Sequence, residues 1–146
     1  MKKINIANFF LAAVFICTAL LVSCDVIDDD DTPSFQVYDI MPSDGSTDVS
    51  TGVVISISFS AEVNKDTATT DSVSVSDSHG MPVAGKVDVS GVAVSFAPTS
   101  KLQYLTAYTV TITTQLQDIH GRSLPEDYKS TFSTVANASA EASGSE

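Results

Sequence analysis

Apolar and polar side chains alternate in short runs along most of the chain, from about residue 35 to residue 135. In the clearest run, Val53, Ile55, Ile57 and Phe59 alternate with one valine and two serines. A period of two is typical of a β-strand with one buried face, and this part of the chain lacks the period of an amphipathic helix. The pattern predicts seven strands, at residues 35–40, 53–59, 73–75, 83–89, 92–96, 108–112 and 128–132.

Turn-forming residues separate the predicted strands, at residues 42–45, 77–80, 90–91 and 118–121. Seven short strands in about 100 residues are what an immunoglobulin-like (Ig-like) sandwich needs, because each sheet must bury one face against the other. We therefore predict an all-β fold, a Greek-key Ig-like β-sandwich over residues 35–135. Val53, Ile55, Ile57 and Phe59 should face the opposite sheet.

The N-terminal part of the chain has a different pattern. Lys2 and Lys3 precede a run of 14 residues, 9–22, that is apolar apart from Thr18. A helix of that length would reach about 21 Å, short of the ~30 Å of hydrocarbon that a spanning helix must cross. This layout is typical of a secretory signal.

The apolar run ends at Leu21, Val22, Ser23 and Cys24, a sequence that resembles the lipobox of bacterial lipoproteins. The resemblance implies a signal peptide over residues 1–23, recognised by its peptidase through Leu21, Val22 and Ser23. It also implies a covalent lipid on Cys24, which would hold the protein to a membrane, and we expect no other cofactor. The alternatives are an ordinary signal peptide cleaved near Ser23 and an uncleaved anchor.

Five carboxylates follow the cysteine within seven residues, namely Asp25, Asp28, Asp29, Asp30 and Asp31. Mutual repulsion keeps such a run extended and solvated, so we predict an acidic tether over residues 24–34. One interpretation is that any polar spacer would serve. In the other, the run resembles the surface-export signals of Bacteroidota lipoproteins, which implies the outer face of the outer membrane. In enteric bacteria, an Asp next to the Cys instead favours the inner membrane.

Seven motifs across residues 35–135 resemble, in order, the bacterial Ig-like domain named for the SbsA S-layer protein. They lie at residues 42–49 (PSDGSTDV), 55–63, 83–87, 96–98, 108–112, 118–124 (DIHGRSL) and 131–134. The resemblance implies an all-β sandwich that usually serves as a non-catalytic module of surface and secreted proteins.

Leu102 and Tyr108 resemble the tyrosine corner of Greek-key sandwiches, with Leu six residues before Tyr and Thr106 two residues before it. The resemblance implies that the Tyr108 ring packs under the preceding loop while its hydroxyl bonds an upstream backbone group. The alternative is a tyrosine that only fills an edge.

Groups that could carry chemistry are few. The two histidines, His79 and His120, both lie in Asp-x-His-Gly turns. Following the predicted strands up and down places these turns at opposite ends of the sandwich, about 20 Å or more apart, so they cannot share a metal or catalytic centre. The acidic run at 28–31 lacks the alternating order of a calcium loop, and we interpret Asp118 as a turn former. We predict no metal site and no enzyme activity.

Charge and composition bear on partners. Removal of residues 1–23 leaves 5 basic and 18 acidic side chains, a net charge of about −13, which argues against nucleic acid. The small, polar tail at residues 136–146 is predicted to be disordered.

We expect a lipid-anchored, non-catalytic module displayed at the cell envelope, with a structural, adhesive or protein-interaction role. The alternative is a glycan-binding accessory lipoprotein of a polysaccharide-uptake system. Because the chain has no Trp, Tyr38, Tyr104 and Tyr128 are the candidate sugar platforms.

Overall fold

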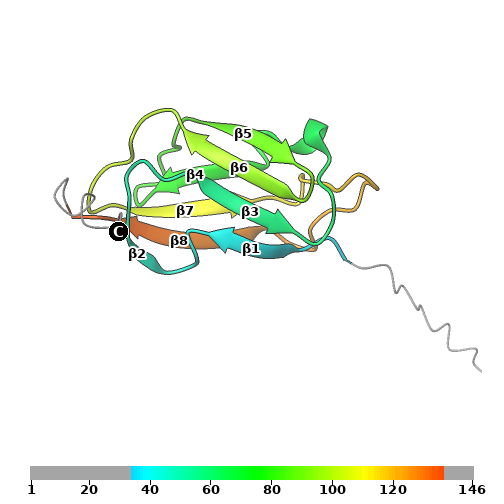
Figure 1. The fold of residues 1–146 in the computed structure, drawn as a ribbon, viewed down its shortest axis with the longest axis horizontal. Coiled ribbons are helices and arrows are strands. Elements are labelled where there is room, and N and C mark those ends of the chain that lie inside the picture. Colours follow the sequence, from blue (N-terminus) through cyan, green and yellow to red (C-terminus); the bar gives the residue numbers. More distant parts are fainter. Residues whose placement is uncertain (1–33, 137–146) are drawn as a thin grey trace, which may run out of the picture. The chain divides into compact units, whose positions relative to one another are not determined.

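The computed structural model describes residues 34–136, which form two four-stranded β-sheets packed face to face (Figure 1). The strand orders are β1-β3-β6-β5 in one sheet and β2-β8-β7-β4 in the other. The elements are β1 (Val37–Met41), β2 (Ser46–Val49), β3 (Ile55–Phe59), β4 (Val73–Asp77), β5 (Gly85–Ser90), β6 (Ala93–Pro98), β7 (Ala107–Ile112), β8 (Tyr128–Thr134) and a 3-10 turn, η1 (Lys65–Thr67). The predicted all-β Ig-like sandwich is confirmed.

The alternation in β3 produces the buried face that the sequence predicts. Ile55, Ile57 and Phe59 are almost fully buried, whereas Val53 precedes the strand and is only half-buried. The Phe59 ring stacks on Phe35, with centroids 5.0 Å apart and planes 16° apart. The core continues through the inward side chains of the other strands, which include Ile40, Val73, Val75, Val94, Phe96, Tyr108, Val110, Ile112 and Phe132. It therefore draws on both sheets.

One strand, β2, is absent from the predicted set. It has four residues, none of them buried, and it pairs in parallel with β8 at only two positions. The preceding turn is held on β8 by Asp44, whose Oδ1 accepts hydrogen bonds from the Thr131 N–H (2.7 Å) and hydroxyl (3.0 Å). The Gly45 N–H donates to the Thr131 carbonyl (2.7 Å). These long-range hydrogen bonds hold β2 against β8, and residues 46–49 show no alternation of apolar and polar side chains that would predict a strand.

The connection from β4 to β5 crosses from one sheet to the other. The Val83 N–H donates to the Val75 carbonyl on β4 (2.8 Å), and the Thr99 N–H, just after β6, donates to the Ala84 carbonyl (2.9 Å). Val83 therefore lies ahead of β5, although the sequence predicted that the strand begins there. The crossing segment covers part of the outer edge of β4.

The lipobox at Leu21–Cys24 and the acidic run from Asp25 to Asp31 lie outside the described residues. So do the rest of the predicted tether, apart from Ser34, and the C-terminal tail, apart from Ala136. Within residues 34–136, no helix has the length and apolar character needed to cross a bilayer.

Candidate functional site

Asp118 is buried at the centre of the turn between β7 and β8. Its Oδ1 accepts hydrogen bonds from the His120 N–H (2.8 Å) and the Arg122 N–H (2.9 Å), and its Oδ2 lies 2.6 Å from both Nε and Nη2 of Arg122. Burial raises the pKa of Asp118, but the Arg122 and His120 N–H groups and the guanidinium lower it, and the net pKa lies below the ordinary value. The carboxylate closes the turn, as the turn-former interpretation expects.

Asp77 makes the same backbone arrangement in the turn between β4 and β5. Its Oδ1 accepts from the His79 N–H and the Met81 N–H, both at 2.9 Å. The Met81 N–H is the main cause that lowers the pKa of Asp77, opposed in part by burial and supported by the His79 N–H and ring. No guanidinium caps this turn, and the exposed His79 ring approaches only to 4.0 Å from Nδ1 to Oδ2 of Asp77. The two Asp-x-His-Gly turns thus share a backbone fold and differ in burial.

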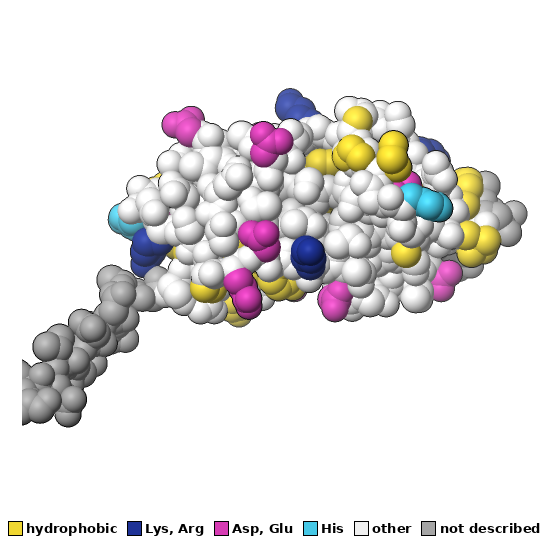
Figure 2. Space-filling view, turned by 180° about the vertical axis from the view of Figure 1, so that it is seen from behind, with side chains coloured by type: hydrophobic (Ala, Val, Ile, Leu, Met, Phe, Trp, Pro, Cys, Tyr) yellow, Lys and Arg dark blue, Asp and Glu magenta, His cyan; other side chains and the backbone are white. Residues whose placement is uncertain are grey.

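The two histidines lie at opposite ends of the sandwich. Asp77 pairs with Tyr108 at one end of the β4–β7 ladder, and Val73 pairs with Ile112 at the other. His79 follows β4 at the first end, and His120 follows β7 at the second. In Figure 2, histidine side chains are visible toward both ends of the molecule. The predicted placement of the two turns at opposite ends of the sandwich is confirmed by this register. Within residues 34–136, no group of three or more His, Cys, Asp or Glu side chains could hold a metal ion.

Tyr108 and Leu102 have the geometry of a tyrosine corner. The Tyr108 ring is buried and stacks on Phe132, with centroids 5.6 Å apart. Its hydroxyl accepts a hydrogen bond from the Gln103 N–H at 2.9 Å. Leu102 is buried, and its N–H donates to the Thr51 carbonyl (2.8 Å). These contacts fix the loop between β6 and β7, so both residues serve the fold.

The three candidate aromatic platforms do not form one surface. Tyr38 is 84% exposed on β1, beside an irregularity in the β1–β3 register. Tyr128 is half-buried at the start of β8, opposite Ile112, whereas Tyr104 precedes β7 at the far end of the same ladder. The structure therefore separates Tyr104 from Tyr128.

A pocket of about 400 Å³ lies beside Tyr128. It is lined by Gln36 and Val37 at the start of the described chain and by residues 124–129 ahead of and within β8. The half-buried Tyr128 and the acidic residues Glu126 and Asp127 therefore occur in one region, whereas Tyr38 does not line the pocket. Sequence reasoning missed this pocket, because its two sides lie nearly ninety positions apart and neither carries a motif.

The fold described above is that of the Ig-like β-sandwich class, and a sequence comparison identifies the family. A family model described as a bacterial Ig-like domain matches residues 30–134. The chain belongs to this family, and the resemblance to a bacterial Ig-like domain is confirmed. No curated protein sequence matches the chain significantly.

Solved structures share the fold at low sequence identity. The N-terminal part of the bacterial S-layer protein SbsC is 20% identical, with a TM-score of 0.54, and the match covers 70% of this chain and 24% of that one. CopC from Methylosinus trichosporium OB3b is 16% identical, with a TM-score of 0.60, over 70% of this chain and 95% of CopC. E. coli alpha-2-macroglobulin is 18% identical, with a TM-score of 0.56, over 73% of this chain and 6% of that protein. These likenesses show the fold alone.

Proposed function

We propose that the protein is a lipid-anchored, non-catalytic Ig-like module displayed at the bacterial cell envelope, with a structural or protein-interaction role. The observation that carries this proposal is membership of the bacterial Ig-like domain family over residues 30–134. The lipobox that ends at Cys24 supplies the anchor, and the acidic tether supplies the spacing from the membrane. The outer face of the outer membrane is the location that the acidic run favours.

The chemistry of the described residues supports a role in binding. The two histidines lie too far apart to cooperate, and the buried Asp118 carboxylate is occupied by its turn and by Arg122. Tyr108 holds the loop before its own strand. Asp118 and Tyr108 thus stabilise the fold, and the edges and loops of the sandwich are the surfaces that would contact a partner.

Replacement of the lipidated cysteine tests the anchor. Cys24→Ala should abolish incorporation of radiolabelled palmitate and move the protein from the membrane fraction to soluble or unprocessed forms. Cys17→Ala is the matched control, because it removes a thiol within the apolar run, and it should leave labelling unchanged. Labelling of the Cys24→Ala variant would show that the lipoprotein assignment is wrong.

Protease added to whole cells tests the display at the surface. Changing Asp28, Asp29, Asp30 and Asp31 together to Asn should keep palmitate labelling and should protect the domain from the protease. Changing the same residues to Glu keeps the charge and should keep the domain accessible. Equal accessibility of the Asn variant would reduce the acidic run to a spacer. Cross-linking on intact cells, followed by pull-down, should then recover a specific envelope protein.

Glycan binding is a second candidate function, favoured by the pocket beside Tyr128. Sugar rings stack on exposed aromatic faces, and carboxylates accept their hydroxyl groups. If this function holds, a glycan array should show a specific signal that Tyr38→Ala or Tyr128→Ala removes. Tyr104→Ala, at the other end of the ladder, should retain it. An array without a specific signal would exclude the glycans tested and leave the protein-interaction role.

A further inference from the structure

β5 is an outer strand with one neighbour. Its six residues pair with β6 in continuous antiparallel register, from Gly85 opposite Pro98 to Ser90 opposite Ala93, without a bulge. Figure 1 shows β5 at the margin of the sandwich. Its second edge is therefore open along the whole strand in the described part of the chain.

The direction of the backbone groups on β5 follows from one hydrogen bond. The Thr99 N–H donates to the Ala84 carbonyl, so the Ala84 carbonyl faces the β6 side. In an antiparallel ladder the backbone groups of alternate residues point to the same side. Gly85, Val87 and Val89 therefore turn their N–H and C=O groups away from β6. None of these groups has a hydrogen-bond partner within residues 34–136.

The other outer strands are shorter or partly covered. β1 has a register irregularity between Val37 and Asp39, and β2 has only four residues. The outer edge of β4 is occupied where the Val83 N–H bonds to the Val75 carbonyl. Unpaired strand edges are the places where sheets add further strands. Among the described strands, β5 thus offers the longest regular open edge.

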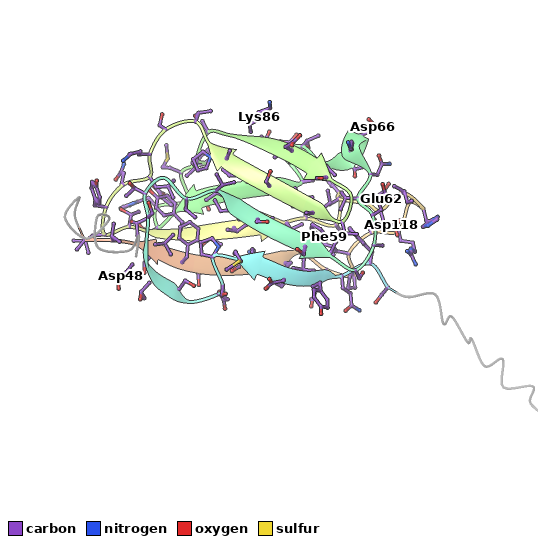
Figure 3. The ribbon with its side chains drawn as sticks, in the orientation of Figure 1. Asp48, Phe59, Glu62, Asp66, Lys86 and Asp118 are labelled. Carbon is purple, nitrogen blue, oxygen red and sulfur yellow. The ribbon has the colours of Figure 1, made fainter. Side chains whose placement is uncertain are left out.

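Two opposite charges stand on the exposed face of β5. Lys86 and Asp88 are both exposed, and neither has an ion-pair partner in the described part of the chain. Figure 3 shows Lys86 projecting from the margin of the sandwich. Between them lies Val87, which is half-buried and packs against the core. The sequence Lys-Val-Asp is complementary in charge to itself when it is read in the reverse direction.

We propose that β5 is a self-pairing edge, which joins β5 of a second copy in an antiparallel ladder centred on Val87. In this register Val87 lies opposite Val87 of the second copy, and Gly85 lies opposite Val89, so the outward-facing backbone groups bond to one another. Lys86 lies opposite Asp88 of the second copy, and the two-fold symmetry repeats the pair. Such directly opposite positions bring side chains into contact.

The charges also select this register against its neighbours. A shift to a ladder centred on Lys86 places lysine opposite lysine, and a ladder centred on Asp88 places aspartate opposite aspartate. Like charges directly opposite each other destabilise a ladder. A shift of the register by a single residue places the outward-facing backbone groups of one copy opposite backbone groups of the other copy that already bond to β6. The Val87-centred ladder alone among these satisfies both the backbone and the charges.

The pairing is expected to be weak in dilute solution. One six-residue strand pair is small beside the ~1,600 Å² of a standard stable interface. If the lipid anchor of the proposed function holds, two copies in one membrane have a raised effective concentration, which favours the contact. The ladder itself does not require the anchor, so its test is separate from that of the anchor.

Disulfide trapping tests the register. Two differently tagged full chains are co-expressed, one with Lys86→Cys and the other with Asp88→Cys. The Cα atoms of this pair should lie about 4.5 Å apart, within the range of a disulfide, and the second Lys86–Asp88 pair stays intact. Mild oxidation should trap a mixed dimer, whereas each variant expressed alone should not be trapped above the wild-type background.

A cysteine on the same strand provides the control. Ser90→Cys is exposed but would lie four residues from Asp88→Cys of the second copy, about 13 Å away, so this combination should not be trapped. Equal trapping of both combinations, or trapping only to a different protein, would overturn the proposal.

Charge reversal gives a second test in the full chain. Energy transfer between labelled copies in detergent should show that Lys86→Asp or Asp88→Lys alone weakens self-association about tenfold or more. The double variant should restore it, and a mixture of the two single variants should form mixed pairs. Circular dichroism should show that all variants keep the β-sheet spectrum. Failure of the double variant to recover self-association would refute the ladder.

Discussion

Truncation of Phe59 tests the core of the sandwich where the alternation of β3 ends. Phe59, labelled in Figure 3, is 4% exposed, and its ring stacks on Phe35, which lies two residues ahead of β1. Phe59→Ala should therefore cost about 3–5 kcal/mol of unfolding free energy, because the buried ring leaves a cavity behind. For a domain of about 100 residues, this corresponds to a fall in melting temperature of roughly 15–30 °C.

Urea and thermal unfolding of a fragment with residues 32–136 would measure this loss. Ser58→Ala is the matched control, because Ser58 lies one position away on the other face of β3, and it should change the stability by less than about 0.5 kcal/mol. Phe59→Leu should lie between the two, since it keeps much of the volume but loses the stack on Phe35.

A double-mutant cycle isolates the stacked pair. Phe59→Ala and Phe35→Ala should be non-additive by about 0.5–1.5 kcal/mol, because each removes the same ring contact. Comparable urea midpoints for Phe59→Ala and Ser58→Ala would refute the assignment of the buried face. Simple additivity would refute the stack as a stabilising contact.

Three further predictions concern the loops. Tyr108→Phe leaves the Gln103 N–H without its acceptor and should lower the unfolding free energy by about 1–2 kcal/mol in urea melts. An unchanged urea midpoint would show that this hydrogen bond does not stabilise the fold. Asp118→Ala removes the hydrogen-bond acceptor of a buried turn and the ion-pair partner of Arg122, which should cost about 2–4 kcal/mol of unfolding free energy. It should lower the melting temperature more than Asp77→Ala does in the equivalent, more exposed turn. Because the pKa values of Asp118 and Asp77 lie below the unfolded value of about 3.9, their stabilisation is present above that pH and is lost as the pH falls through the folded pKa values. Stability should thus fall between pH 5 and about pH 2, less steeply in Asp118→Ala; identical slopes would contradict the carboxylate's role.

Features that depend on local order were predictable. The alternation in residues 53–59 identified β3 and its buried face, because successive side chains of a strand point to opposite faces. Turn residues marked the strand ends, and the spacing of Leu102 and Tyr108 indicated a corner whose hydroxyl bond reaches only five residues back. Their boundaries were less predictable, since Val83 continues the apolar pattern of β5 but bonds to β4.

Features that depend on distant partners were not predictable. β2 forms because Asp44 and Gly45 bond to Thr131, 87 positions from Asp44, and no side-chain pattern in residues 46–49 encodes that contact. The pocket beside Tyr128 also depends on distant residues, since Val37 near the start of the domain's sequence lines it together with residues 124–129.

The two Asp-x-His-Gly turns mark the limit of local information. Sequence alone determined that both are turns, that they end strands and that the chain folds as an Ig-like sandwich, because a turn and a period of two are properties of neighbouring residues. Only the tertiary structure decided that Asp118 is buried beneath Arg122 while Asp77 is half-buried, and that β5 keeps an open edge while the outer edge of β4 is partly covered. Burial and edge coverage depend on which distant segments pack alongside, and that packing is settled by the whole chain at once.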